Sequence, residues 1–332
     1  MEDKSRTQQS EAGPGRFAAY AWFVTAVTLA VILWGAFVRA SRSGDGCGDH
    51  WPLCHGSVVP DASQAKTLVE FAHRATSGVA FLLVVGLCVW ALRAYRRGHP
   101  VRAAAALSGL FIVTESLIGA GLVLLRLVGD NTSVARAVYL SVHLVNTFLL
   151  FASLGLTAWW ASRGSRERPR LAEFFKGRAG VAILGSLALG VSGAVAALGA
   201  TLFPEAGAGA DVEAMSPASR VLFSLRHYYI HPLFALAVGA YLVHFALSLR
   251  RAGRDGWTRR WASWVLGLVA AQFAAGLVNA ALLAPVWLQI VHLLLADLLW
   301  LALVLLCAAS LAPSESAAEE FGRVGLAPAV EI

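Results

Sequence analysis

The sequence has 332 residues, of which 58% are hydrophobic and only 14% are charged. A soluble domain of this length carries about a quarter charged residues, so the composition excludes an ordinary soluble protein. The net charge of +7 comes from basic residues dispersed over short stretches, with no basic platform interleaved with aromatic residues. It therefore does not predict nucleic-acid binding.

The apolar residues gather into eight runs of about twenty residues, which is the length of a helix that spans a membrane. We therefore predict an all-α membrane protein with eight transmembrane helices, in contact with membrane lipid. The polar ends, residues 1–17 and 312–332, are expected to be cytoplasmic tails, since no cleavable signal is visible. The runs cover approximately residues 18–40, 68–92, 103–125, 136–160, 179–202, 221–248, 261–283 and 286–311.

The distribution of basic residues predicts the orientation of these spans. If the N-terminus is cytoplasmic, 19 of the 27 Lys and Arg residues fall in the cytoplasmic segments. Such an excess agrees with the positive-inside rule. Both termini are therefore expected on the cytoplasmic side.

The spans divide into two similar halves, residues 18–162 and 179–311, joined by a cytoplasmic linker over residues 163–178. Val-His-Leu occurs in the fourth and eighth spans, and the third and seventh spans carry Glu115-x-x-x-Gly119 and Gln272-x-x-x-Gly276. We predict two four-helix bundles related by a pseudo-two-fold axis along the membrane normal.

Four histidines lie at similar depth, five to ten residues from the outer starts of the second, fourth, sixth and eighth spans. Ionisable residues inside a membrane are usually functional, and neutral imidazole is the usual protein ligand of haem iron. The matched depth predicts two bis-histidine haem sites, one in each half. The predicted ligands are His73 with His143 and His231 with His292, and His227, four residues before His231, is the competitor.

Charged residues near these histidines have two interpretations each. Glu70 shares a helical face with His73; it either orients the imidazole and exchanges protons, or pairs with Arg74 to hold the helix end. Arg39 either contacts a porphyrin propionate or extends to the membrane surface. Glu115 and Asp297 either belong to a proton path or are protonated and hydrogen-bonded, and we favour the structural role.

The first outer loop, residues 41–67, holds Cys47 and Cys54 on the oxidising side, where a disulfide is the expected state. Its spacing leaves open whether the bond is structural or redox-active. No separate metal, nucleotide or phosphate motif is visible.

Together these residues resemble the haem A synthase family, whose first outer loop reads approximately Arg-x-x-x-Ser-Gly-x-x-Cys-x-x-Trp-Pro-x-Cys-x-Gly and whose second helix carries Glu-x-x-His-Arg. The resemblance extends over all eight spans. The present chain has one additional residue between the first cysteine and Trp-Pro, and His231-Pro232 where many members have His-Arg. The matching residues are Arg39, Ser43, Gly44, Cys47, Trp51, Pro52, Cys54, Gly56, Glu70, His73 and Arg74.

This resemblance implies an enzyme of the bacterial cytoplasmic membrane that oxidises a methyl group of haem O to a formyl group. It implies substrate haem between His73 and His143, a haem b cofactor between His231 and His292, and Glu70 as the acid–base residue. Haem supplies the oxidation chemistry, and the protein positions and tunes it. Haem O synthase, terminal-oxidase assembly proteins and a second copy of the chain are candidate partners.

Two other classes of function use the same histidines. A dihaem b-type electron-transfer protein that oxidises quinol or thiols requires the four ligands but not Glu70. A haem carrier for oxidase assembly requires no redox cycle. The Glu70–His73 spacing and the cysteine loop favour the enzyme.

Overall fold

The computed structural model describes residues 14–61, 63–163, 174–203, 215–217, 219–220, 223, 230–252 and 255–311. Apart from an isolated β-bridge between Cys54 and Ser57, these residues form helices and their connections. This confirms the predicted all-α class. The helices of membrane-spanning length are α1 (Pro14–Ala40), α2 (Ala65–Ala94), α3 (Pro100–Leu124), α4 (Val134–Arg163), α5 (Gly177–Leu202), α7 (Ile230–Arg251), α8 (Gly256–Ala281) and α9 (Val286–Leu311).

The helix ends differ from the predicted bounds for local reasons. Helix α1 begins at Pro14, inside the expected tail, and proline is well tolerated in a first helical turn because its missing N–H needs no partner there. Helix α8 begins earlier than predicted because the Asp255 side chain accepts a hydrogen bond from the Thr258 N–H at 2.8 Å. Most of the predicted start of the sixth span, residues 221–229, lies outside the described residues.

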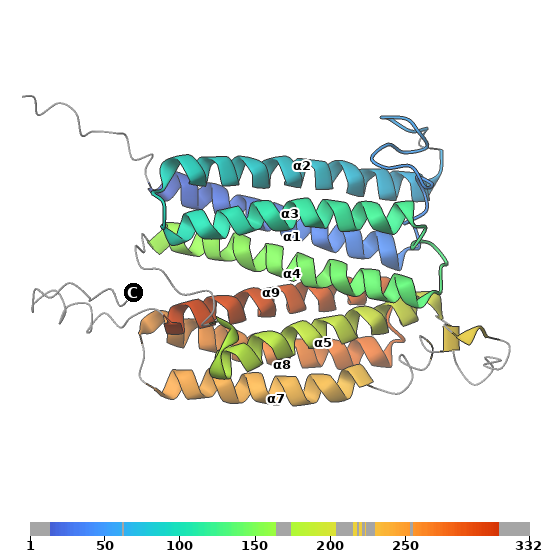
Figure 1. Cartoon of the computed structure of the whole chain (residues 1–332). Helices are drawn as coiled ribbons and strands as arrows, with labels where there is room; N and C mark the ends of the chain where they lie inside the picture. Colours follow the sequence, from blue (N-terminus) through green and yellow to red (C-terminus); the bar gives the residue numbers. More distant parts are fainter. Residues whose placement is uncertain are drawn as a thin grey trace, which may run out of the picture.

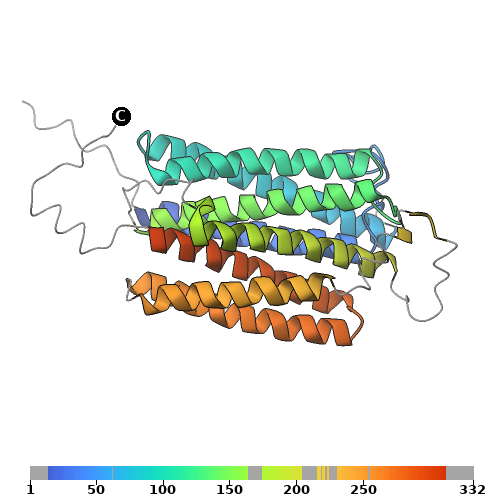
Figure 2. The same cartoon turned by 60° about the horizontal axis from the view of Figure 1, so that its bottom comes forward.

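In each half, the described helices of membrane-spanning length are arranged in a ring (Figures 1 and 2). In the N-terminal half, α1 and α3 each pack against α2 and α4, so α2 and α4 lie across the diagonal from each other. In the C-terminal half, α5 and α8 each pack against α7 and α9, which occupy the other diagonal. The arrangement is consistent with the predicted pseudo-two-fold relation, and it places all four histidine-bearing helices on diagonals.

The halves meet along α1, α4, α5 and α9, which pack against one another at the centre of the molecule. Trp300 of α9 stacks on Phe148 of α4 at 5.2 Å between ring centroids, and its Nε1 donates to the Phe148 carbonyl at 2.8 Å. Both side chains are buried. Large apolar side chains such as Leu82, Leu117 and Leu277 are instead exposed on the peripheral helices, as expected for surfaces in contact with lipid.

The cysteine loop joins α1 to α2 at one end of the bundle, which we call the cysteine-loop end (Figure 1). The α3–α4 connection and the turn between α8 and α9 lie at the same end. The four histidines lie in the part of each helix that is nearer to this end. The structure thus keeps the matched depth that the sequence predicted.

Candidate functional site

Each of the four histidines packs against a glycine of the preceding helix. A Cβ atom on Gly35, for example, would lie 2.9 Å from the ring of His73, so a larger residue would displace the imidazole. The glycines therefore leave room for the rings between closely packed helices. The pairs, with the closest approach of that Cβ position to the ring, are Gly35–His73 (2.9 Å), Gly119–His143 (3.7 Å), Gly193–His231 (3.0 Å) and Gly276–His292 (3.1 Å).

His73 of α2 and His143 of α4 lie on the diagonal helices of the N-terminal half, and His231 of α7 and His292 of α9 lie on those of the C-terminal half. Their pairing as haem ligands stays a prediction. Two imidazoles from diagonal helices of one bundle can coordinate a single iron from opposite sides. His227 lies outside the described residues, so its competition with His231 stays a prediction.

The second ring nitrogen of His231 has a hydrogen-bond partner that sequence reasoning missed. Ser192 of α5 places its Oγ 2.9 Å from His231 Nδ1. Such a bond orients a ligand imidazole and leaves Nε2 available for a metal. Nothing in the sequence distinguished this serine from the others in the apolar spans.

In α4, the ring of His143 is held by a carboxyl group. Glu115 Oε1 of α3 lies 3.1 Å from His143 Nε2. Asn146 Nδ2 donates to Glu115 Oε2 at 2.6 Å, and the Thr147 hydroxyl lies 2.5 Å from Oε1. Glu115 is therefore hydrogen-bonded, as its favoured structural role requires. Nothing in the sequence indicated that its partner is a candidate ligand.

The equivalent position in the C-terminal half is occupied by an amide. Gln272 Nε2 of α8 lies 3.2 Å from His292 Nε2. The matching Glu115-x-x-x-Gly119 and Gln272-x-x-x-Gly276 patterns indicated that these two positions are equivalent. In each half, the glycine and the polar residue of the pattern contact the same histidine ring.

Glu70 faces the cysteine loop. Its Oε2 accepts a hydrogen bond from the Cys47 N–H at 2.8 Å, and its Oε1 accepts one from Arg74 Nε at 3.1 Å. Arg74 also donates to the backbone carbonyls of His50 and Leu53. These contacts match the interpretation in which Glu70 and Arg74 hold the helix end, and they place the carboxyl one helical turn from His73.

Cys47 and Cys54 form the expected disulfide, and both are buried. The loop that they close is also attached to the α3–α4 connection, because Asp49 pairs with Arg126. The hydrogen bond from Arg126 holds the pKa of Asp49 below its ordinary value. The loop is thus fixed on two sides.

Arg39 connects the two halves. Its Nη1 donates to the Ala197 carbonyl and to Thr201 Oγ1, both at 2.8 Å, and its Nη2 donates to Gln289 Oε1 at 3.1 Å. The Arg39 side chain thus bonds to helices of the other half instead of extending to the membrane surface. The propionate role of Arg39 and Arg74 stays a prediction.

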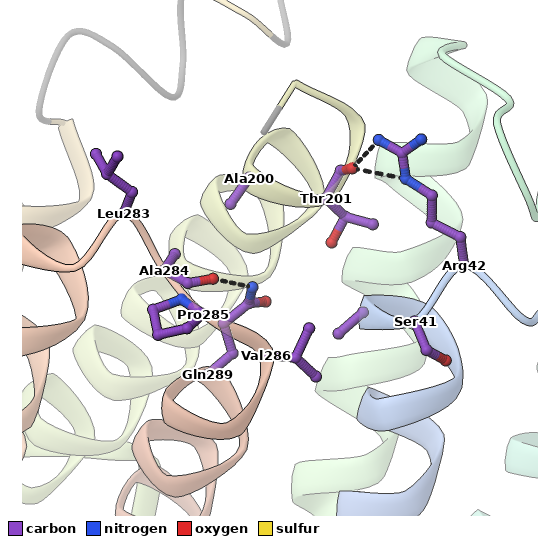
Figure 3. Close-up of a pocket in the computed structure, with 10 residues that line it drawn as sticks. Ser41, Arg42, Ala200, Thr201, Leu283, Ala284, Pro285, Val286 and Gln289 are labelled. Atoms are coloured by element: carbon purple, nitrogen blue, oxygen red, sulfur yellow. Dashed lines mark hydrogen bonds between the residues drawn. The ribbon is translucent and has the colours of Figure 1, made fainter. Parts of the chain in front are cut away.

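Beside this connection, a cavity of about 400 Å³ opens between α1, the end of α5 and the α8–α9 turn. Figure 3 shows Arg42 reaching across it to the Thr201 carbonyl, with Gln289 on the far side donating to the Ala284 carbonyl. Arg42 therefore satisfies a carbonyl at the C-terminal end of α5, a position that favours positive charge.

The described fold and site define a multi-pass, all-helical protein with two half-buried histidines on the diagonal helices of each half. The chain belongs to the COX15-CtaA family of cytochrome oxidase assembly proteins, whose model matches residues 18–304.

Three relatives illustrate the similarity. A Thermus thermophilus protein named protoheme IX farnesyltransferase is 50% identical over 304 residues, which cover 89% of this chain and 48% of that protein. The haem A synthase of Exiguobacterium sibiricum is 34% identical over 139 residues, covering 42% and 44% of the two chains. That of Geobacillus kaustophilus is 42% identical over 105 residues, covering 31% and 33%. The aligned parts span about half or less of these relatives.

Proposed function

We propose that this chain is a haem A synthase, an oxidoreductase that converts a ring methyl group of haem O to a formyl group by successive hydroxylations. The observation that carries the proposal is the presence of two histidine pairs on diagonal helices, one pair in each half. Membership of a family of cytochrome oxidase assembly proteins and the similarity to haem A synthases support it.

The described residues around the histidines suit a porphyrin better than a bare metal ion. Among them no group of three or more His, Cys, Asp or Glu side chains could hold such an ion. The buried Nδ1 atoms of His73, His143 and His292 have no hydrogen-bond partner in the described structure. Two imidazoles per site are the ligand set of a bis-histidine haem.

In this proposal His73 and His143 hold the substrate haem, and His231 and His292 hold a haem b cofactor. Haem b supplies electron transfer when bound. The chain positions both rings, and Ser192 orients His231 through Nδ1. Glu70 holds or moves a proton at the cysteine-loop end, where its carboxyl is buried and fixed by Cys47 and Arg74.

Haem extraction after co-expression with a source of haem O tests the proposal. We expect haem A, or its hydroxylated precursor, in membranes that contain the chain together with the haem O source. Membranes with the haem O source and a His143→Ala chain are the matched control and should contain neither. If the intact chain yields only haem B and unchanged haem O, the proposal is wrong.

A dihaem electron-transfer protein is the second candidate, because both oxygens of the Glu70 carboxyl are already engaged by the loop and by Arg74. Such a protein keeps its haem unmodified. The same extraction separates the two candidates, because the second one predicts haem b spectra with no formyl product.

The setting of the enzyme is part of the proposal. We place the cysteine-loop end outside the bacterial cytoplasmic membrane and both termini inside, as the distribution of basic residues favours. We also propose that a haem O-forming farnesyltransferase works beside this chain. The Thermus relative bears the name of that activity and is about twice as long as the part aligned here. Co-purification of the two proteins tests the partnership.

A further inference from the structure

The two halves hold the ring of their last histidine in the same way but with different chemical groups. Glu115 Oε1 lies 3.1 Å from His143 Nε2, and Gln272 Nε2 lies 3.2 Å from His292 Nε2. Each polar residue is on the preceding helix, four residues before the glycine that contacts the same ring. The sites are therefore matched in position and differ by a carboxyl in one half and an amide in the other.

The carboxyl is also the better anchored of the two. Asn146 donates to Glu115 Oε2 at 2.6 Å, and its other contacts, to the Phe111 carbonyl and the Thr114 hydroxyl, fix the amide in place. The Thr147 hydroxyl is 2.5 Å from Glu115 Oε1. Gln272 lacks such support, because its buried Oε1 has no hydrogen-bond partner among the described residues.

This contact occupies a nitrogen that haem iron needs. Imidazole binds metals through Nε2 or Nδ1, and the Nδ1 atoms of His143 and His292 are both buried. Iron binding at Nε2 requires the bond to Glu115 or to Gln272 to break. Asn146 and Thr147 hold the Glu115 carboxyl against the ring, whereas the Gln272 amide has no such support among the described residues. The haem-free arrangement is therefore stabilised more strongly in the N-terminal half.

We propose that Glu115 makes the haem of the N-terminal half exchangeable by competing for His143 Nε2, whereas Gln272 at the equivalent place leaves the C-terminal haem resident. This inference rests on the proposed function, in which one haem is a substrate that enters and leaves and the other is a cofactor. Glu115 acts through His143 and is a positioning residue.

A reciprocal exchange of the two residues tests the proposal. The probe is haemin itself, and the measurement is the rate of haem transfer from the purified full-length chain to excess apomyoglobin, followed by absorbance. The N-terminal site is measured in a chain carrying His292→Ala, and the C-terminal site in one carrying His143→Ala. We expect Glu115→Gln to slow loss from the N-terminal site about fivefold to tenfold, and Gln272→Glu to accelerate loss from the C-terminal site by a similar factor.

Asn279→Asp is the matched control, because it places a carboxyl on α8 seven residues beyond Gln272, away from the Gln272–His292 contact. It should leave both rates unchanged. The proposal is wrong if Glu115→Gln leaves the rate of haem loss from the N-terminal site unchanged or increases it. If that variant does not fold, the proposal is wrong if Gln272→Glu leaves the rate of haem loss from the C-terminal site unchanged.

Haemin transfer is measured without any product, so the outcome separates from that of the proposed function. Reversed exchange rates in a chain that forms no haem A keep the role of Glu115 and reject the synthase. Normal haem A formation with unchanged exchange rates would keep the synthase function and reject this role of Glu115.

Discussion

The N-terminal and C-terminal halves place their histidines at matching points and surround them with different chemistry. In the N-terminal half, Glu115 contacts His143 and Glu70 lies one turn from His73. In the C-terminal half, the described partners are neutral, Ser192 for His231 and Gln272 for His292. One helical scaffold thus holds two similarly placed sets of histidines whose neighbouring side chains differ.

The largest effect is expected from removing one of the candidate haem ligands of the C-terminal half. We expect His231→Ala or His292→Ala to abolish the low-spin haem b signal, because one imidazole cannot supply both axial bonds. The measurement is the optical spectrum and the haem content per chain. His244→Ala, on the same helix as His231 but near its other end, is the control. A spectrum that survives both ligand changes would contradict the assignment and direct attention to His227.

Glu70 distinguishes the halves in a second way, and its two interpretations predict different results. Glu70→Gln keeps an oxygen for the Cys47 N–H but cannot exchange a proton, so product formation should fall about 10²–10⁴-fold with haem retained. Glu70→Ala should in addition lower the free energy of unfolding by about 1–3 kcal/mol, because it leaves Arg74 and the Cys47 N–H without their acceptor.

Product analysis by haem extraction and thermal unfolding in detergent measure these two effects separately. Full activity in the Glu70→Gln chain would reject proton exchange by Glu70 and leave holding the cysteine loop as its role.

The contact between the halves can be weakened through Arg39. Arg39→Gln shortens the side chain and removes the guanidinium that bonds Thr201 and Gln289, so the free energy of unfolding should fall by about 2–4 kcal/mol. Thermal unfolding in detergent measures the change. Arg126→Gln, an exposed arginine at the same end, should have little effect. Equal effects of the two variants would show that the cross-half bonds of Arg39 add nothing to stability.

The elements that the sequence predicted best are those with a strong physical signal. Long apolar runs predict spans because a bilayer requires them, and the histidines at matched depth lie on the diagonal helices of the two halves. The expected outer position of the first loop predicted the Cys47–Cys54 disulfide, which the structure contains. These signals depend on composition and spacing, which are visible without coordinates.

The contacts across helix interfaces were less accessible. Whether Arg39 points to lipid, to a propionate or to the other half depends on how the bundles pack, and no residue near Arg39 in sequence indicates Gln289 as a partner. Ser192 likewise becomes informative only once α5 and α7 are placed side by side. Sequence periodicity identifies a face of a helix but not the side chain that meets it.

Asp297 offers a smaller test, at the junction of the halves. It is fully buried in α9, and neither carboxyl oxygen has a hydrogen-bond partner among the described residues. A buried polar group without a partner is destabilising, so Asp297→Val should raise the free energy of unfolding by about 1–2 kcal/mol. Thr157→Val, a polar-to-apolar change at a residue bonded to the Ser153 carbonyl, should lower it instead.

The product of the Asp297→Val chain separates the two roles considered for this residue. The hydrogen-bonded role expected for Asp297 is wrong for the described residues, because neither of its oxygens has a partner there. An aspartic acid with no part in the chemistry predicts a more stable chain that still forms haem A. A member of a proton path predicts the same gain in stability with loss of product. Thermal unfolding and haem extraction from one preparation measure both. We expect product formation to be retained, since the described residues provide no hydrogen-bonded neighbour to which Asp297 could pass a proton.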